Sequence, residues 1–140
     1  MTAARTATCP CGAVRAVCEG EPVRISVCHC LACQQRTGSA FAAQVRFPAN
    51  QVTLTGETRN WARTGDSGGT ADYHFCPTCG STVIYVARAM PEVIAVPIGA
   101  FADPAAFPAP WAEVYEERKF DWVEVTLGAE PGDTDPASLT

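Results

Sequence analysis

Seven of the eight cysteines in this chain fall into three short groups, which makes metal binding the first chemistry to consider. Thiolate sulfur is a preferred ligand of zinc, and a Cys-x-x-Cys turn bends the chain enough for both sulfurs to reach one ion. The groups are Cys9-Pro10-Cys11-Gly12, Cys28-His29-Cys30-Leu31-Ala32-Cys33 and Cys76-Pro77-Thr78-Cys79-Gly80. This clustering predicts bound metal rather than isolated thiols.

The first and third groups each end in glycine, which lets backbone N–H groups turn toward the thiolates. Structural zinc takes four protein ligands, whereas catalytic zinc takes three and leaves a position for water or substrate. The cysteine count therefore predicts two zinc ions per chain. The closed, structural site uses Cys9, Cys11, Cys76 and Cys79, and the open, catalytic site uses Cys28, Cys30 and Cys33.

Three thiolates leave a bound zinc ion with a net negative formal charge, so it activates water poorly compared with a three-histidine site. Hydrolysis is therefore disfavoured. Such an ion favours a fourth, exogenous thiolate, whose pKa it lowers while the sulfur stays nucleophilic. The open site predicts the making or breaking of a carbon–sulfur bond.

The alternative is that the middle group is also structural and is completed by a histidine or by Cys18. His29 lies between two predicted ligands, where an extended chain points it to the opposite side, so we expect it to support the site or face a bound ligand. His74 should share the face of Cys76 as a structural histidine. Cys18 ends a strand-like run, which favours a buried, inert thiol over a ligand or redox role.

The polar segment after the middle group is the first candidate for substrate binding. A short turn would place some of its side chains beside the open zinc position as hydrogen-bond donors, the alternative being a solvated turn. The candidate binding residues are Gln34, Arg36 and Thr37. Trp61, Trp111 and Trp122 are expected in the core or as walls of a ligand cleft.

Short β-strands must position these groups, because eleven glycines and eleven prolines spread along 140 residues exclude long helices. The predicted strands are Ala13–Cys18, Phe41–Phe47, Val52–Thr55, Arg59–Arg63, Ala71–Phe75, Thr82–Ala87, Val93–Ile98, Glu113–Glu117 and Trp122–Leu127. Helical turns are predicted at Cys30–Thr37 before Gly38, and at Asp103–Phe107 with Asp103 as cap and Pro104 first. Gly65–Thr70 is predicted to be a flexible loop. We expect one mainly β, zinc-binding domain over residues 1–127 and a frayed tail over 128–140.

Charge argues against a nucleic-acid partner, because the net charge is −5, Lys119 is the sole lysine and no basic run exists. Residues 1–10 lack the apolar core of a secretory signal, and charged residues and prolines interrupt the most apolar stretch, Val83–Ala102, which excludes a membrane span. A cytoplasmic location is therefore expected. There an even cysteine count favours metal ligation, with disulfides as the alternative in an exported chain.

The ordered cysteine pattern resembles the glutathione-dependent formaldehyde-activating enzyme family over about residues 7–127. The motifs that carry the resemblance are Cys9-x-Cys11-Gly12-Ala13-Val14-Arg15, Cys28-His29-Cys30-x-x-Cys33, Thr37-Gly38-Ser39, Phe41, Phe75-Cys76-x-x-Cys79-Gly80-Ser81, Gly99, Asp103-Pro104 and Trp122. The resemblance implies several small coiled β-sheets and the same division of cysteines between a structural and a catalytic zinc. It further implies a carbon–sulfur lyase, working in the synthetic direction, that joins glutathione to formaldehyde as S-hydroxymethylglutathione.

The chain departs from the family pattern at Glu113, where many relatives have a histidine. Arginines that could grip the carboxylates of glutathione are few, and no spacing singles one out: Arg36, Arg46, Arg59, Arg63 and Arg88. Two other functions use the same ligands. One is capture of a small thiol without turnover, and the other is a zinc-supported interaction module, including the chromatin role of a eukaryotic branch, which the acidic charge disfavours. The sequence leaves the oligomeric state open.

Overall fold

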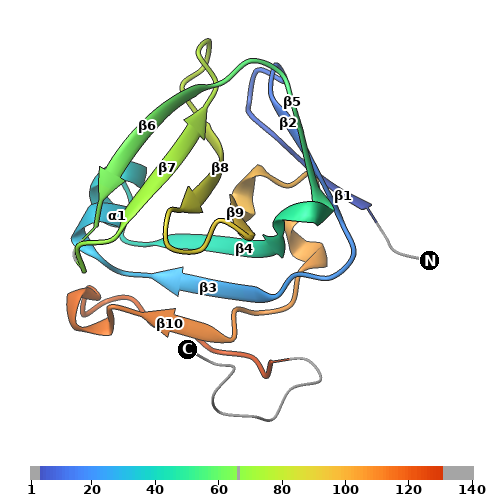
Figure 1. Ribbon diagram of the computed structural model, residues 1–140. Coiled ribbons are helices and arrows are strands. Elements are labelled where there is room, and N and C mark those ends of the chain that lie inside the picture. The colour runs from blue at the N-terminus through green and yellow to red at the C-terminus, as the bar shows by residue number, and fades with distance from the viewer. Residues whose placement is uncertain (1–3, 66, 131–140) are drawn as a thin grey trace.

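The computed structural model, which describes residues 4–65 and 67–130, is mainly β, as predicted (Figure 1). Two sheets contain its strands. The smaller sheet has the order β1 (Ala4–Thr8), β2 (Arg15–Glu19), β5 (Val52–Thr55). The larger has the order β10 (Ala112–Val114), β3 (Arg24–Cys28), β4 (Ala42–Pro48), β9 (Val93–Pro97), β8 (Thr82–Ala87), β7 (Thr70–Phe75), β6 (Arg59–Thr64). Neighbouring strands are antiparallel except β10 and β3, which are parallel.

Helical structure is short. The α-helix α1 (Leu31–Thr37) follows the predicted turns, with Cys30 as its N-cap and Gly38, at φ 66°, as its C-cap. The 3₁₀ turns are η1 (Ala49–Gln51), η2 (Ile98–Ala100), η3 (Pro104–Ala106) and η4 (Glu116–Arg118). The predicted turn at Asp103–Phe107 is η3, with Pro104 first, although the Asp103 side chain makes no capping hydrogen bond. Among the described residues, no helix has the length and apolar character needed to cross a bilayer.

A core of apolar side chains joins the two sheets. Val45 and Phe47 of β4 belong to this core, together with Ala16 of β2 and Val83 of β8. Full burial of each large apolar side chain contributes about 1.5–3 kcal/mol. Cys18 is also fully buried in this core, as predicted for an inert thiol. The core therefore fixes the strands that carry the cysteine groups.

Two strands were not predicted. In β3 four of the five residues are buried, so the polar–apolar alternation of a half-exposed strand is absent. In β1 small and polar residues pair with β2 at an edge, where little apolar pattern is required. The predicted loop Gly65–Thr70 includes Asp66, which lies outside the described residues, and Thr70 already begins β7.

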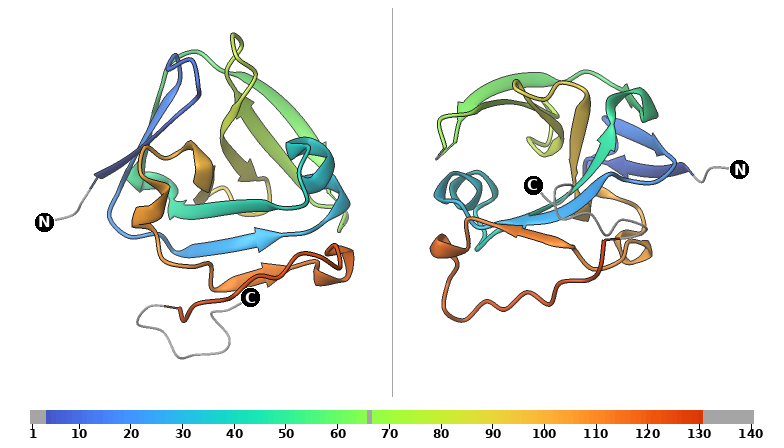
Figure 2. Two further views of the ribbon diagram at one scale, coloured as in Figure 1. Left: turned by 180° about the vertical axis from the view of Figure 1, so that it is seen from behind. Right: turned by 60° about the horizontal axis from the view of Figure 1, so that its bottom comes forward.

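The strand predicted at Trp122–Leu127 is wrong, because this segment has no regular structure and Trp122 is 75% exposed. Figure 2 shows the orange-to-red chain after β10 running back along the outside of the molecule. The strand predicted at Glu113–Glu117 already ends at Val114, since Tyr115 takes a left-handed conformation and η4 begins at Glu116. Of the predicted tail, residues 131–140 lie outside the described residues.

Candidate metal centres and adjoining cavity

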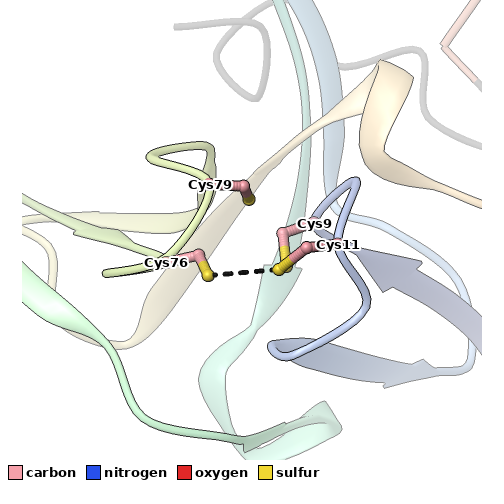
Figure 3. A group of neighbouring side chains, drawn as sticks. All are labelled: Cys9, Cys11, Cys76 and Cys79. Atoms are coloured by element: carbon pink, nitrogen blue, oxygen red, sulfur yellow. Dashed lines mark hydrogen bonds between the residues drawn. The ribbon is translucent and has the colours of Figure 1, made fainter.

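The structure brings the first and third cysteine groups together at a junction between the sheets (Figure 3). Cys9 and Cys11 lie in the turn between β1 and β2, and Cys76 and Cys79 in the turn between β7 and β8. All four sulfurs lie within 4.8 Å of one another, and Cys11 Sγ is 3.6 Å from both Cys9 Sγ and Cys76 Sγ. Four sulfurs at zinc bond length stand about 3.8 Å apart in a tetrahedron. The donor set therefore fits a closed four-thiolate site.

Backbone N–H groups face these sulfurs, as expected from the glycine that follows each pair. The N–H of Val14 donates to Cys9 Sγ at 3.3 Å, and that of Thr78 donates to Cys76 Sγ at 3.4 Å. Backbone hydrogen bonds, chiefly at Ser81, lower the pKa of Cys79 to about 6. At Cys79 the turn therefore favours the thiolate form that metal binding requires. His74 lies on β7 outside this group of sulfurs.

The middle cysteines gather at the end of β3 and the start of α1. Cys28 is the last residue of β3, and Cys30 caps α1 by accepting a hydrogen bond from the N–H of Cys33 at 3.2 Å. Their three sulfurs lie within 4.8 Å of one another. No fourth cysteine, histidine, aspartate or glutamate of the described chain joins this group. Its chemistry fits an ion with one ligand position left open.

The three thiols differ in acidity because they contact one another. A hydrogen bond from the Cys28 thiol lowers the pKa of Cys33 to about 5, and the Arg36 guanidinium lowers it further. The same contact with Cys33, together with burial, raises the pKa of Cys28. Arg36 follows Cys33 by three residues on α1, so both side chains share one helix face. Helix α1 thus places a positive charge beside the thiol group.

His29 lies outside the group of three sulfurs and anchors the loop to β10. Its ring is fully buried, with Nε2 2.6 Å from Glu113 Oε2, and its backbone N–H donates to the carbonyl of Val114 at 3.1 Å. Glu113 is the residue that the sequence analysis expected to differ from the histidine of the family that the chain resembles. Its partnership with His29 is a feature that sequence analysis did not identify.

A cavity of about 220 Å³ adjoins the three thiols. Cys28, Cys30 and Cys33 form part of its wall, and the other wall residues come mainly from the large sheet and the segment after β10, among them Gln44, Arg46, Tyr73, Tyr85, Val114 and Tyr115. Such a volume suits a small reactant and the end of a larger one. The three-thiol group therefore borders a partly open cavity.

A buried chain of hydrogen bonds supports the cavity wall. The Tyr85 hydroxyl donates to Gln44 Oε1 at 2.8 Å, and Gln44 Nε2 donates to Ser26 Oγ at 2.7 Å. Burial raises the pKa of Tyr85, so its hydroxyl keeps its proton as a donor. Sequence analysis did not identify these residues, because they come from three separate strands. The one available signal was the polar Gln44 between the apolar Ala43 and Val45.

Tyr115 is the only described residue other than glycine with a positive φ, at 56°. An aromatic residue takes this conformation at a cost, and such residues occur often at functional sites. Here the conformation ends β10 and places Tyr115 in the wall of the cavity. The sequence predicted a continuous strand and so missed this residue.

The predicted binding residues after Cys33 take different places. The Gln34 side chain donates to the carbonyls of His29 at 2.9 Å and Arg118 at 3.1 Å, so it ties α1 to η4. Thr37 Oγ1 donates to the carbonyl of Cys33 at 2.8 Å, within the helix. Arg36 is the member of this segment that approaches the thiols.

Comparison with known proteins agrees with these features. The family model described as "Glutathione-dependent formaldehyde-activating enzyme" matches residues 4–118. No curated protein matches the chain. A crystal structure of a Rhodobacter sphaeroides protein has a similar fold, with a TM-score of 0.53 and 22% identity over 68% of this chain and 85% of that chain. The family match spans most of the sequence and all three cysteine groups, and the chain therefore belongs to the glutathione-dependent formaldehyde-activating enzyme family.

Proposed function

We propose that this protein is a zinc-dependent carbon–sulfur lyase that, in the synthetic direction, adds glutathione or a similar thiol to formaldehyde. The observation that carries the proposal is the group of Cys28, Cys30 and Cys33, which has three sulfurs within 4.8 Å and borders a cavity of about 220 Å³. Zinc in that group would supply a lowered pKa for the substrate thiol. The four-thiol group would hold a second, structural zinc.

The reaction needs only proton transfer besides the new bond. The substrate thiol loses its proton, its sulfur bonds to the carbonyl carbon, and the carbonyl oxygen gains a proton, so R–SH and CH₂O give R–S–CH₂OH. Arg46 in the cavity wall offers a positive charge for the oxygen as negative charge develops on it. Tyr115 offers a hydroxyl in the same wall as the proton donor.

Native mass spectrometry and adduct formation test the proposal together. We expect two zinc ions per chain in the zinc-supplied protein and one in Cys30→Ser. Exchange of formaldehyde into S-hydroxymethylglutathione, followed by NMR, should be accelerated by the wild-type protein and not by Cys30→Ser. Tyr115→Phe should keep both zinc ions and lose about a hundredfold of the acceleration, a typical contribution of a general acid.

Cys18→Ala is the matched control, because it removes a cysteine that lies in the core and outside both groups. It should retain both zinc ions and the acceleration. Two zinc ions and a bound thiol without acceleration in the wild-type protein would refute the enzyme and favour thiol capture. One zinc ion, unchanged in Cys30→Ser, would refute the open metal site itself.

A further inference from the structure

A second, larger hollow lies beside the cavity and carries three arginines. Its volume is about 870 Å³, in the range of sites for molecules of drug size. Arg36 and Gln35 of α1 form one side, and β6 and β7 supply most of the rest, including Arg59, Trp61 and Arg63. We call this hollow, defined by Arg36, Arg59, Trp61, Arg63 and Tyr73, the arginine groove.

The arginines share the groove because of strand alternation. Arg59, Trp61 and Arg63 occupy every second position of the edge strand β6, and therefore face the same side. Their partners across the strand pair are Phe75, Tyr73 and Ala71, respectively. No acidic residue is among those that line the groove in the described structure. The sequence contained this signal, a period of two within the strand predicted at Arg59–Arg63.

The acidic residue of β7 turns away from the groove. Asp72 follows the opposite alternation from Tyr73, and its carboxylate accepts two hydrogen bonds from Arg88, both at 3.0 Å. Arg88 was one of the arginines considered for binding the carboxylates of glutathione, and its guanidinium is instead paired with Asp72. The positive charge of Arg59 and Arg63 is not neutralised by an ion pair within the described chain.

Aromatic rings hold two of the guanidinium groups in place. Arg36 lies 4.7 Å from the centre of the Tyr73 ring and 5.1 Å from that of Tyr85. Arg63 lies 5.9 Å from the rings of Trp61 and Tyr73. Stacking limits the side-chain freedom that carboxylate binding would otherwise remove. Arg36 Nε and Arg63 Nη1 are also buried without a hydrogen-bond partner in the described chain.

The groove adjoins the three-thiol cavity through shared residues. Tyr73 lines both hollows, and its ring stacks on Tyr85 of the cavity wall with 4.8 Å between centres. Arg36, at the groove, follows Cys33, in the cavity wall, by three residues on α1, so both side chains lie on one helix face. A ligand with its sulfur at the thiols and its body in the groove would therefore pass Tyr73.

We propose that the arginine groove binds the carboxylate groups of the substrate thiol, so that the protein selects an anionic, peptide-sized thiol over a neutral one. The inference rests on the proposed function for the place of the sulfur. Guanidinium groups match carboxylates through paired hydrogen bonds, and rigid arginines make such recognition specific. In a chain of net charge −5, a local positive groove is what allows an acidic ligand to approach.

Titration calorimetry with S-methylglutathione tests the groove apart from the reaction, because its blocked sulfur can neither react nor bind metal as a thiolate. The zinc-supplied full chain should bind this probe, and binding should weaken with added salt. Arg59→Gln/Arg63→Gln should weaken binding about tenfold or more, as expected for loss of a charge-assisted pair. The diethyl ester of the probe should bind both proteins equally weakly.

Two further variants test whether weaker binding of the probe reflects only a loss of positive charge. Arg15→Gln removes one positive charge, against two in Arg59→Gln/Arg63→Gln, from an exposed position on β2, and should leave binding of the probe within about twofold of wild type. Arg59→Lys/Arg63→Lys keeps the charge and should recover part of the affinity if electrostatic attraction contributes. Circular dichroism would establish whether Arg59→Gln/Arg63→Gln is folded. If it is not, the binding of Arg59→Gln and of Arg63→Gln is compared with wild type instead.

The outcomes separate this inference from the proposed function. Equal binding of S-methylglutathione and its ester, or unchanged binding in Arg59→Gln/Arg63→Gln, would overturn the groove proposal even if the protein accelerates adduct formation. Specific binding of the free acid without acceleration would uphold the groove and refute the lyase. Absence of binding by wild type at millimolar S-methylglutathione would also overturn the groove proposal.

Discussion

Surroundings decide what each cysteine of this chain can do. Cys79 lies in an exposed turn where backbone N–H groups lower its pKa to about 6. Cys33 lies beside Cys28 and Arg36, which lower its pKa to about 5. Cys18 lies in the apolar core, where burial raises its pKa to about 11. The same side chain therefore favours the thiolate form at Cys33 and Cys79 and serves as an apolar filler at Cys18.

Cys18 should make stability depend on pH in the alkaline range. Its pKa rises from 9.0 to about 11 on folding, so the unfolded chain releases this proton first. The stabilisation is complete below pH 9.0 and is lost as pH rises toward 11. Urea unfolding across this range should give a steeper loss of free energy for wild type than for Cys18→Ala.

The difference in the free energy of unfolding between wild type and Cys18→Ala reports on Cys18 alone, because the other thiols titrate in both proteins. The two pH profiles should converge in slope below neutral pH, where Cys18 is protonated in both states. Parallel profiles throughout the alkaline range would mean that Cys18 ionises equally in the folded and unfolded chain.

At the scale of elements, the junction of β3 and α1 builds the three-thiol group. The strand ends at Cys28, one residue of loop follows, and Cys30 then caps the helix. Parallel pairing with β10 fixes the loop from the other side, through the contacts of His29 with Glu113 and Val114. Strand, loop and helix together hold three sulfurs near one point.

The hydrogen bonds that link Ser26, Gln44 and Tyr85 should stabilise this region, because they leave none of the three buried side chains without a partner. Gln44→Leu leaves the hydroxyls of Ser26 and Tyr85 buried without partners, at about 1–3 kcal/mol for each group. We therefore expect a loss of about 2–6 kcal/mol in the free energy of unfolding, measured with urea in zinc-containing buffer.

The triple variant Ser26→Ala/Gln44→Leu/Tyr85→Phe is the control, because it removes the unpaired groups together with the glutamine. It should recover most of the stability that Gln44→Leu loses. A triple variant less stable than Gln44→Leu would show that apolar packing, rather than hydrogen bonding, determines the effect.

At the scale of the molecule, the local sequence predicted the grouping of the cysteines better than it predicted the strands of the sheets. Ligand number and the glycines after Cys11 and Cys79 were enough to separate a four-thiol from a three-thiol group. The buried strand β3 escaped prediction because it lacks alternation, and Trp122–Leu127 was misassigned because alternation is present without a partner strand. Glu113 and Tyr115 join the site through tertiary contacts that no local pattern encodes, whereas Gln44 is a polar residue between apolar neighbours in its strand.

The four-thiol group connects parts of the fold that are distant in sequence. Cys11, beside the small sheet, approaches Cys76, beside the large sheet, across 65 positions of chain. A cross-link over such a separation removes unfolded-chain freedom worth about 4 kcal/mol. The three-thiol group spans one strand end and one helix, so it closes almost no loop. Zinc at the two groups should therefore affect stability very differently.

Removing the two proposed zinc ions with a strong chelator under reducing conditions should lower the melting temperature by about 14 °C, the shift expected for 4 kcal/mol in a chain of this size. Cys76→Ser should reproduce this loss in zinc-containing buffer, because three thiolates hold the junction less firmly. Cys30→Ser should shift the melting temperature by less than about 3 °C while abolishing turnover. Scanning calorimetry of the three samples at one pH makes the comparison. If Cys30→Ser melts as low as Cys76→Ser, the division into a structural and a catalytic group is wrong.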